Sequence, residues 1–190
     1  MSAPKIWNLQ RETCHAKCVV FDIYKEHFAH PSDGRSGDFY VAHAPDWVTV
    51  VPVTKDGKIV IVNQFRFGIR GLSWEFPGGV IDKGEDFLHA AAREVAEETG
   101  FTGDPPISLG SAAANPAIMN NRHHSVLIEN CVHSTGTHFD ANEEIETRLA
   151  TPAEVLELAR SGKMFHALML TTLAKVLVSR PDVFGFPAIR

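Results

Sequence analysis

The sequence has few cysteines and no long hydrophobic run. Only three of its 190 residues are cysteine, an odd number spread along the chain, which argues against a disulfide framework and favours a reducing compartment. No apolar stretch approaches the roughly 18 residues that a membrane span requires, and the N-terminus lacks the basic and then apolar pattern of a signal peptide. We therefore expect a cytoplasmic protein without a membrane partner.

The sequence also lacks any run of lysine and arginine. Its formal net charge is -5, from 18 basic and 23 acidic side chains, so it has no electrostatic footprint for a nucleic-acid backbone. With 44% hydrophobic and 22% charged residues, it has the composition of an ordinary globular domain. An acidic protein that acts on phosphates would need metal ions to bridge the like charges.

The most informative stretch is a glycine turn, an acidic loop and an amphipathic helix between residues 78 and 101. Gly78 and Gly79 permit backbone conformations that side chains forbid, and Gly100 stands where a helix commonly ends in a left-handed residue. A buried stripe is predicted at 3-4-residue spacing: Phe87, Leu88, Ala91, Ala92 and Val95.

The opposite face of this helix concentrates carboxylates. Glu94 and Glu98 are four residues apart, and like charges at that spacing repel each other by a few tenths of a kcal/mol. Such a face is either solvated or neutralised by cations. Mg²⁺ prefers carboxylate and water oxygens and often shares them with a substrate phosphate.

The helix and its flanks resemble the Nudix box at every specified position: Gly79, Glu85, Arg93-Glu94-Val95, Glu97-Glu98 and Gly100-Phe101. An exposed acidic helix explains the EVAEE string alone, but not the glycines, Glu85 and Arg93 in register with it. The resemblance implies an α/β fold, a Nudix-type α/β/α sandwich with a mixed central sheet. It also implies a pyrophosphohydrolase that depends on Mg²⁺, with Mn²⁺ as a possible substitute.

The resemblance also suggests a role for each residue of the box. We expect Glu94 and Glu98 to bind the metal, with Glu97 catalytic beside them, because divalent ions stabilise charge on phosphate oxygens and activate water. The Gly78 carbonyl is implied as a further metal ligand. Glu85 and Arg93 are interpreted as an architectural pair.

A further acid is expected outside the box. Residues 133–145 form a long polar loop that resembles the catalytic loop of ADP-ribose pyrophosphatases, in which a glutamate contacts metal or orients water. Glu143 is the first choice and Glu144 the second, while Asp140 and Glu146 remain possible. At least two of these four acids are expected to be merely solvated.

Substrate-binding residues are predicted at two places. Gln64-Phe65-Arg66 and the segment from Trp74 to Gly79 resemble the pattern of nucleoside-diphosphate-sugar hydrolases. Arg66 suits a phosphate or a dimer interface, and Glu75 suits hydroxyl or base-edge donors. Trp47 and Trp74 are either stacking platforms for a base or core residues.

The second place is residues 115–124, which resemble a segment of a bacterial branch of these hydrolases and differ from the segment that ADP-ribose pyrophosphatases carry there. Asn120 and Arg122 would supply donors for phosphate or sugar oxygens. A structural, amide-rich loop is the alternative.

The remaining pattern predicts the domain organisation. Residues 1–44 are expected to form a β-rich antiparallel arm, with strands at 18–28 and 38–44, and residues 45–190 the Nudix domain. The domain should contain a hairpin at 47–64, strands at 107–111, 125–130 and 145–149, and helices at about 152–161 and 165–179. An arm of two or three strands cannot hide both faces, so we expect it to pack on a second subunit, giving a homodimer.

These observations favour metal-dependent hydrolysis of a nucleoside diphosphate sugar, such as ADP-ribose, to a nucleoside monophosphate and a sugar phosphate. Nucleoside triphosphates, dinucleoside polyphosphates and coenzyme A are alternative substrates for the same box. A non-catalytic nucleotide-sensing module is a further alternative, although such a module would be expected to have a decayed box.

Overall fold

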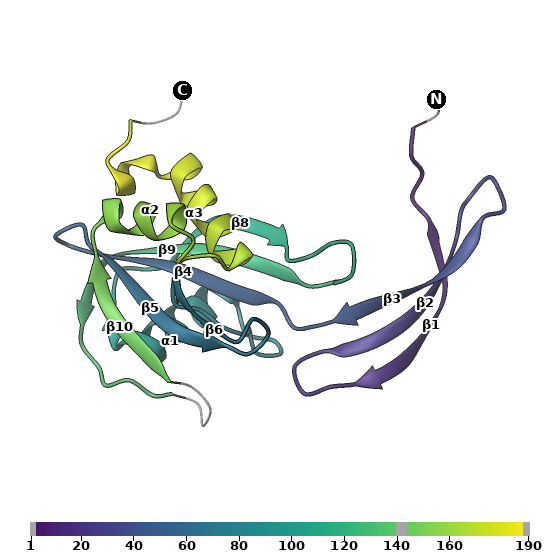
Figure 1. The fold of residues 1–190 in the computed structure, drawn as a ribbon, viewed down its shortest axis with the longest axis horizontal. Helices are drawn as coiled ribbons and strands as arrows, with labels where there is room; N and C mark the ends of the chain where they lie inside the picture. Colours follow the sequence, from purple (N-terminus) through teal and green to yellow (C-terminus); the bar gives the residue numbers. More distant parts are fainter. Residues whose placement is uncertain (1–2, 140–143, 188–190) are drawn as a thin grey trace. The chain divides into compact units, whose positions relative to one another are not determined.

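The chain divides into two compact units (Figure 1). The computed structural model describes residues 3–139 and 144–187. Unit 1 comprises Met1–Pro45 and Ala113–Arg122, and unit 2 comprises Asp46–Ala112 and His123–Arg190.

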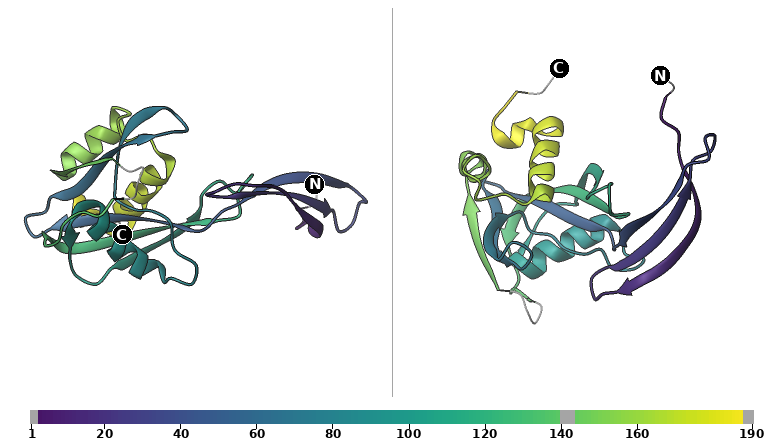
Figure 2. Two further views of the ribbon diagram at one scale, coloured as in Figure 1. Left: turned by 90° about the horizontal axis from the view of Figure 1, so that it is seen from below. Right: turned by 45° about the vertical axis from the view of Figure 1, so that its right-hand side comes forward.

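Unit 1 is built on a three-stranded antiparallel sheet in the order β1-β2-β3. Its strands are β1 (Asn8–Lys17), β2 (Asp22–Ala29) and β3 (Ser36–His43), and Figure 2 shows them as one twisted layer. All ten residues of β1 are exposed, and in β2 only Glu26 is buried. The described part of these strands therefore encloses no hydrophobic core of its own.

The strand boundaries in unit 1 differ from the prediction. The strand expected at 18–28 begins at Asp22, because the residues from Cys18 to Phe21 turn the chain between β1 and β2. The Asp22 carboxylate accepts a hydrogen bond from the Cys18 N–H at 3.2 Å and closes this turn. The return strand lies close to its expected place, whereas β1 was not predicted as a separate strand.

Unit 2 contains a seven-stranded mixed sheet. Its strands are β4 (Trp47–Thr54), β5 (Ile59–Arg66), β6 (Gly71–Glu75), β7 (Phe101–Thr102), β8 (Ile107–Ala113), β9 (Arg122–His133) and β10 (Ile145–Ala150). The main path is β10-β5-β4-β9-β7, with β6 paired to β5 and β8 to β9. β4 and β9 run parallel, whereas β5 is antiparallel to β4, β6 and β10.

Helices cover both faces of this sheet. α1 (Phe87–Thr99) packs on one face, against a core that includes Val48, Val50 and Val126. α2 (Pro152–Arg160), α3 (Ala167–Ser179) and the 3-10 helix η1 (Pro181–Phe184) contribute to the core on the other face. The predicted α/β/α sandwich and antiparallel N-terminal sheet are confirmed (Figures 1 and 2). Among the described residues, every helix is too short or too polar to span a bilayer.

The α1 helix begins and ends as its sequence predicts, but its buried stripe differs. The Asp86 carboxylate caps it by accepting from the Leu88 and His89 N–H groups, and Gly100 ends it with a left-handed φ of 72°. Ala92 is exposed and Ala90 is buried in its place. The stripe is rotated because Glu98 also faces inward and is buried.

Candidate active site

A pocket of about 520 Å³ lies in unit 2 beside α1, and most of its lining is polar. Its lining residues are Gln64, Arg66, Gly78, Gly79, Val80, Asp82, Arg93, Glu94, Glu97, Glu98 and His138. The fold thus brings the predicted box residues Gly78, Glu94, Glu97 and Glu98 together with Arg66 in one cavity.

The two glycines let the backbone pass close to its neighbours. Gly78 has a φ of 155°, and a Cβ placed on it would lie 2.2 Å from the Val48 carbonyl oxygen. A Cβ on Gly79 would lie 2.6 Å from Glu94 Oε1. A side chain at Gly78 would clash with the backbone of β4, and a side chain at Gly79 would displace the Glu94 carboxylate.

Glu98 is the most deeply buried carboxylate of the box. It is 4% exposed, and its Oε2 accepts a hydrogen bond from the Gly78 N–H at 3.0 Å. A buried carboxylate requires compensating positive charge or several donors. Its place in the pocket wall therefore suits a ligand for a cation.

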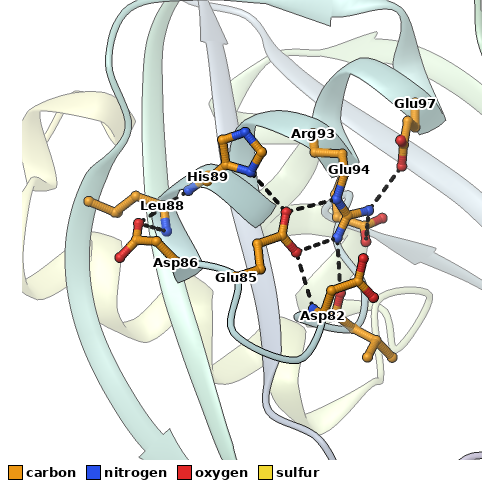
Figure 3. A network of polar contacts seen from close by, with 9 residues as sticks. Asp82, Glu85, Asp86, Leu88, His89, Arg93, Glu94 and Glu97 are labelled. Carbon is orange, nitrogen blue, oxygen red and sulfur yellow. Dashed lines mark hydrogen bonds and ion pairs between the residues drawn. The ribbon is translucent and has the colours of Figure 1, made fainter.

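Arg93 is the centre of a polar network that links loop and helix (Figure 3). Its Nε and Nη2 each donate to Glu85 at 3.0 Å, and Nη2 also donates to the Val80 carbonyl. Its Nη1 donates to Glu94 at 2.8 Å and to Glu97 at 3.0 Å. The hydrogen bonds from Arg93 lower the pKa of the Glu85 carboxyl to about 2. This network holds the acidic loop against the helix and fixes two of the glutamates.

The donor set of the pocket fits a hard divalent cation. Three box glutamates and the tight turn at Gly78 and Gly79 border one cavity, and carboxylate and carbonyl oxygens are the ligands that Mg²⁺ and Mn²⁺ prefer. A separate group of possible metal ligands, Glu12, Glu26 and His43, lies in unit 1. There Glu26 is already paired with His43 at 2.6 Å.

Arg66 and Glu75 form a two-pronged ion pair. Arg66 Nε donates to Glu75 Oε1 at 2.9 Å, and Nη2 donates to Oε2 at 2.5 Å. Glu75 is 0% exposed and is not part of the pocket wall, whereas Arg66 is. The geometry makes Glu75 a residue that orients Arg66.

Neither predicted tryptophan lines the pocket. Trp74 packs on the core beneath α2 and α3, and the Arg148 guanidinium lies 4.6 Å from its ring centroid. Trp47 is half-buried at the start of β4 and forms a bridge with Val80. The structure gives Trp74 the surroundings of a core residue.

Asn120 and Arg122 belong to unit 1. Asn120 Oδ1 accepts from the Ala44 N–H at 3.2 Å, and its own N–H donates to the Ala42 carbonyl. The neighbouring Asn121 is buried and donates to the Pro45 carbonyl at 2.9 Å. These amides tie the segment to the end of β3, and Arg122 is exposed at the start of β9.

The acids predicted in the loop before β10 are only partly described. Asp140 and Glu143 lie outside the described residues, and Glu144 is exposed just before β10. Glu146 lies in β10, where it accepts a hydrogen bond from Asn63 Nδ2 at 3.1 Å. His138 of this loop lines the pocket, although only the acids were singled out from the sequence.

Three comparisons relate this α/β protein to known proteins. A model of the NUDIX domain matches residues 44–172. ADP-ribose pyrophosphatase of Bacillus subtilis is 32% identical over 149 residues, which cover 78% of this chain and 80% of that protein. A hydrolase of CMP-5'-(N-acetyl-N-hydroxy-3-aminopropyl)phosphonate from Streptomyces rubellomurinus is 29% identical over 130 residues, covering 68% of this chain and 63% of that protein.

A solved structure shares the fold. The crystal structure of an ADP compounds hydrolase superposes with a TM-score of 0.80 at 19% identity, covering 93% of this chain and 95% of that one. The chain belongs to the Nudix family. The predictions of this family and of a pyrophosphohydrolase are therefore confirmed.

Proposed function

We propose that this chain hydrolyses the pyrophosphate bond of nucleoside diphosphate sugars such as ADP-ribose. The observation that carries the proposal is the single pocket in which Glu94, Glu97 and Glu98 face the loop at Gly78 and Gly79, with Arg66 in the same wall. The similarity to an ADP-ribose pyrophosphatase over most of both chains supports this substrate class.

We assign Glu94, Glu98 and the Gly78 carbonyl as ligands for Mg²⁺, with Mn²⁺ as a substitute. When bound, such an ion would stabilise negative charge on the phosphate oxygens and lower the pKa of water. The Arg93 network holds Glu94 and Glu97 at the pocket wall, and Glu98 is held by the Gly78 N–H.

The remaining steps fall to acids that act on the attacking water. Glu97 lines the pocket, and we retain Glu143 and Glu144 as candidates for the loop acid that orients the water and accepts its proton. The water oxygen forms a bond to one phosphorus, and the bond from that phosphorus to the bridging oxygen breaks. The bridging oxygen leaves with the bonding electron pair, giving a nucleoside monophosphate and a sugar phosphate.

Arg66 is proposed as the residue that contacts a substrate phosphate, and Glu75 as the residue that orients it. A guanidinium fixed by a carboxylate on one edge is preorganised for an anion on another. A role in substrate contact is still only predicted for four residues: Asn120, Arg122, Trp47 and Trp74.

The partners of the enzyme also remain proposals. We propose an arm of residues 1–44 that joins two copies into a homodimer, a hydrolase domain of residues 45–190 and a cytoplasmic location. The ligand is a small-molecule nucleotide sugar and not a nucleic acid, in keeping with the net charge of -5.

Product analysis over a substrate panel tests the proposal. ADP-ribose, other nucleoside diphosphate sugars, a CMP-linked compound, ATP, a dinucleoside polyphosphate and coenzyme A are incubated with Mg²⁺, with Mn²⁺ or with EDTA. We expect a nucleoside monophosphate and a sugar phosphate from ADP-ribose, and no turnover in EDTA. Release of pyrophosphate from ATP as the main reaction would overturn the substrate class.

A further inference from the structure

Among the described residues that line the pocket, Arg93 uses its hydrogen-bond donors within the protein. Arg93 makes five hydrogen bonds to protein acceptors: three from Nε and Nη2 to Glu85 and Val80, and two from Nη1 to Glu94 and Glu97. A guanidinium has five N–H donors in all. In this arrangement Arg93 has no N–H donor left for a substrate.

Arg66 also donates hydrogen bonds within the protein. Its Nε and Nη2 point to the buried Glu75. A diphosphate carries several non-bridging oxygens that each accept hydrogen bonds, so a pocket that binds it needs donors beyond one edge of Arg66. In the described lining, the other side chains with N–H groups are Gln64 and His138.

His138 is held at the pocket by its backbone. Its N–H donates to the Glu97 carbonyl oxygen at 2.8 Å, which fixes this loop residue beside the last turn of α1. His138 lines the cavity together with Glu94, Glu97 and Glu98. Within residues 3–139 and 144–187, the structure gives the imidazole no acceptor.

We propose that His138 is a substrate-binding residue whose ring N–H donates a hydrogen bond to a non-bridging oxygen of the substrate diphosphate. A neutral imidazole has one such donor, so the contact needs no protonation. The inference rests on the proposed function, since it names a further contact in the same pocket. It gives the loop before β10 a binding role in addition to the role proposed for its acids.

Three variants test this contact. His138→Ala removes the ring, and His138→Asn keeps a short N–H donor. Phe139→Ala is the matched control, because Phe139 is the next loop residue, is 42% exposed and does not line the pocket. KM and kcat are measured with ADP-ribose in Mg²⁺, and binding of ADP in Mg²⁺ is measured by calorimetry.

We expect His138→Ala to raise KM and the dissociation constant of ADP about tenfold, the effect of losing one hydrogen bond to a charged group. His138→Asn should recover much of this loss, kcat should change less than about threefold by the same reasoning, and Phe139→Ala should match the wild type. Unchanged ADP binding in His138→Ala, equal losses in His138→Ala and Phe139→Ala, or a fall in kcat alone would overturn the role.

The measurement of ADP binding distinguishes a failure of this inference from a failure of the proposed function. If the wild type binds ADP but does not hydrolyse ADP-ribose, the proposed substrate fails, while weaker ADP binding by His138→Ala still supports the contact. If the wild type does not bind ADP in Mg²⁺, the pocket is not a diphosphate site and the contact is refuted as well.

Discussion

At the scale of single residues, the glutamates of α1 differ in burial although they look alike in the sequence. Glu98 is 4% exposed and bonded to a backbone N–H, whereas the side chain of Glu97 is 42% exposed and pairs with Arg93. The motif spacing predicted that Glu94 and Glu98 share one face of the helix. It did not predict which one is buried, because burial depends on how closely the glycine loop approaches the helix.

The buried Glu75 makes its partner important for stability. Arg66→Ala leaves a fully buried carboxylate without this guanidinium, so we expect a loss of about 3 kcal/mol of unfolding free energy. Replacing both residues, as Arg66→Met with Glu75→Leu, should restore part of the loss. Urea unfolding measures the unfolding free energies of Arg66→Ala and of the double variant. If Arg66→Ala were as stable as the wild type, the pairing would be contradicted.

His123 should make the stability depend on pH. It lies in β9 and is fully buried, and its Nε2 contacts Thr49 Oγ1 at 2.8 Å. Burial is the main reason that the pKa of the His123 imidazole is lowered to about 4 from an ordinary value of 6.5. Between these values the unfolded chain binds a proton that the folded chain does not, so stability falls as the pH drops from 6.5 to 4.

The loss over this range should reach at most about 3 kcal/mol. Thermal or urea unfolding of His123→Gln should show a weaker pH dependence between pH 6.5 and 4 than the wild type. His15→Gln, which replaces an exposed imidazole in β1, is the control and should keep the wild-type slope. An identical slope in His123→Gln would rule out His123 as the source.

At the scale of elements, α1 and its caps were predicted well because the signals are local. Asp86 and Gly100 fix the two ends through their own backbone and side chain. The hairpin of β4 and β5 followed from apolar runs around a turn with Gly57 at a φ of 76°. β1 was missed because its sequence, NLQRETCHAK, has no apolar alternation, and its place in the sheet comes from pairing with β2.

The cap on α1 gives a prediction for this element. Asp86→Ala removes the acceptor for the Leu88 and His89 N–H groups and should cost about 1 kcal/mol of unfolding free energy. Asp86→Asn keeps a side-chain oxygen and should stay within a few tenths of the wild type. Equal stability of all three proteins in urea would show that the cap contributes nothing.

At the scale of the whole molecule, unit 1 exposes apolar side chains and a strand edge that a second chain could cover. Tyr40 is 52% exposed, Leu9 is 47% exposed, and every residue of β1 is accessible. A long exposed edge strand is a template for pairing with another chain. This feature supports the proposed homodimer of the 20.9 kDa chain.

Light scattering at micromolar concentration tests the assembly. We expect a mass near twice 20.9 kDa, and a shift toward the monomer for Tyr40→Lys, because a charge in an apolar interface is costly to desolvate. Val178→Lys changes an apolar residue of α3 that is even more accessible, at 65% exposed, and should leave the mass unchanged. A monomeric wild type would refute the dimer.

The central claim is that the acids of α1 hold a divalent cation that brings a diphosphate to water. Its most direct test is the turnover of ADP-ribose against Mg²⁺ concentration for the wild type and for Glu98→Gln, with folding of both checked by thermal unfolding. We expect Glu98→Gln to fold normally and to lose at least about 99% of Mg²⁺-dependent turnover, the scale of removing one strong electrostatic contact. A folded Glu98→Gln with near-wild-type turnover and the same Mg²⁺ dependence would contradict it.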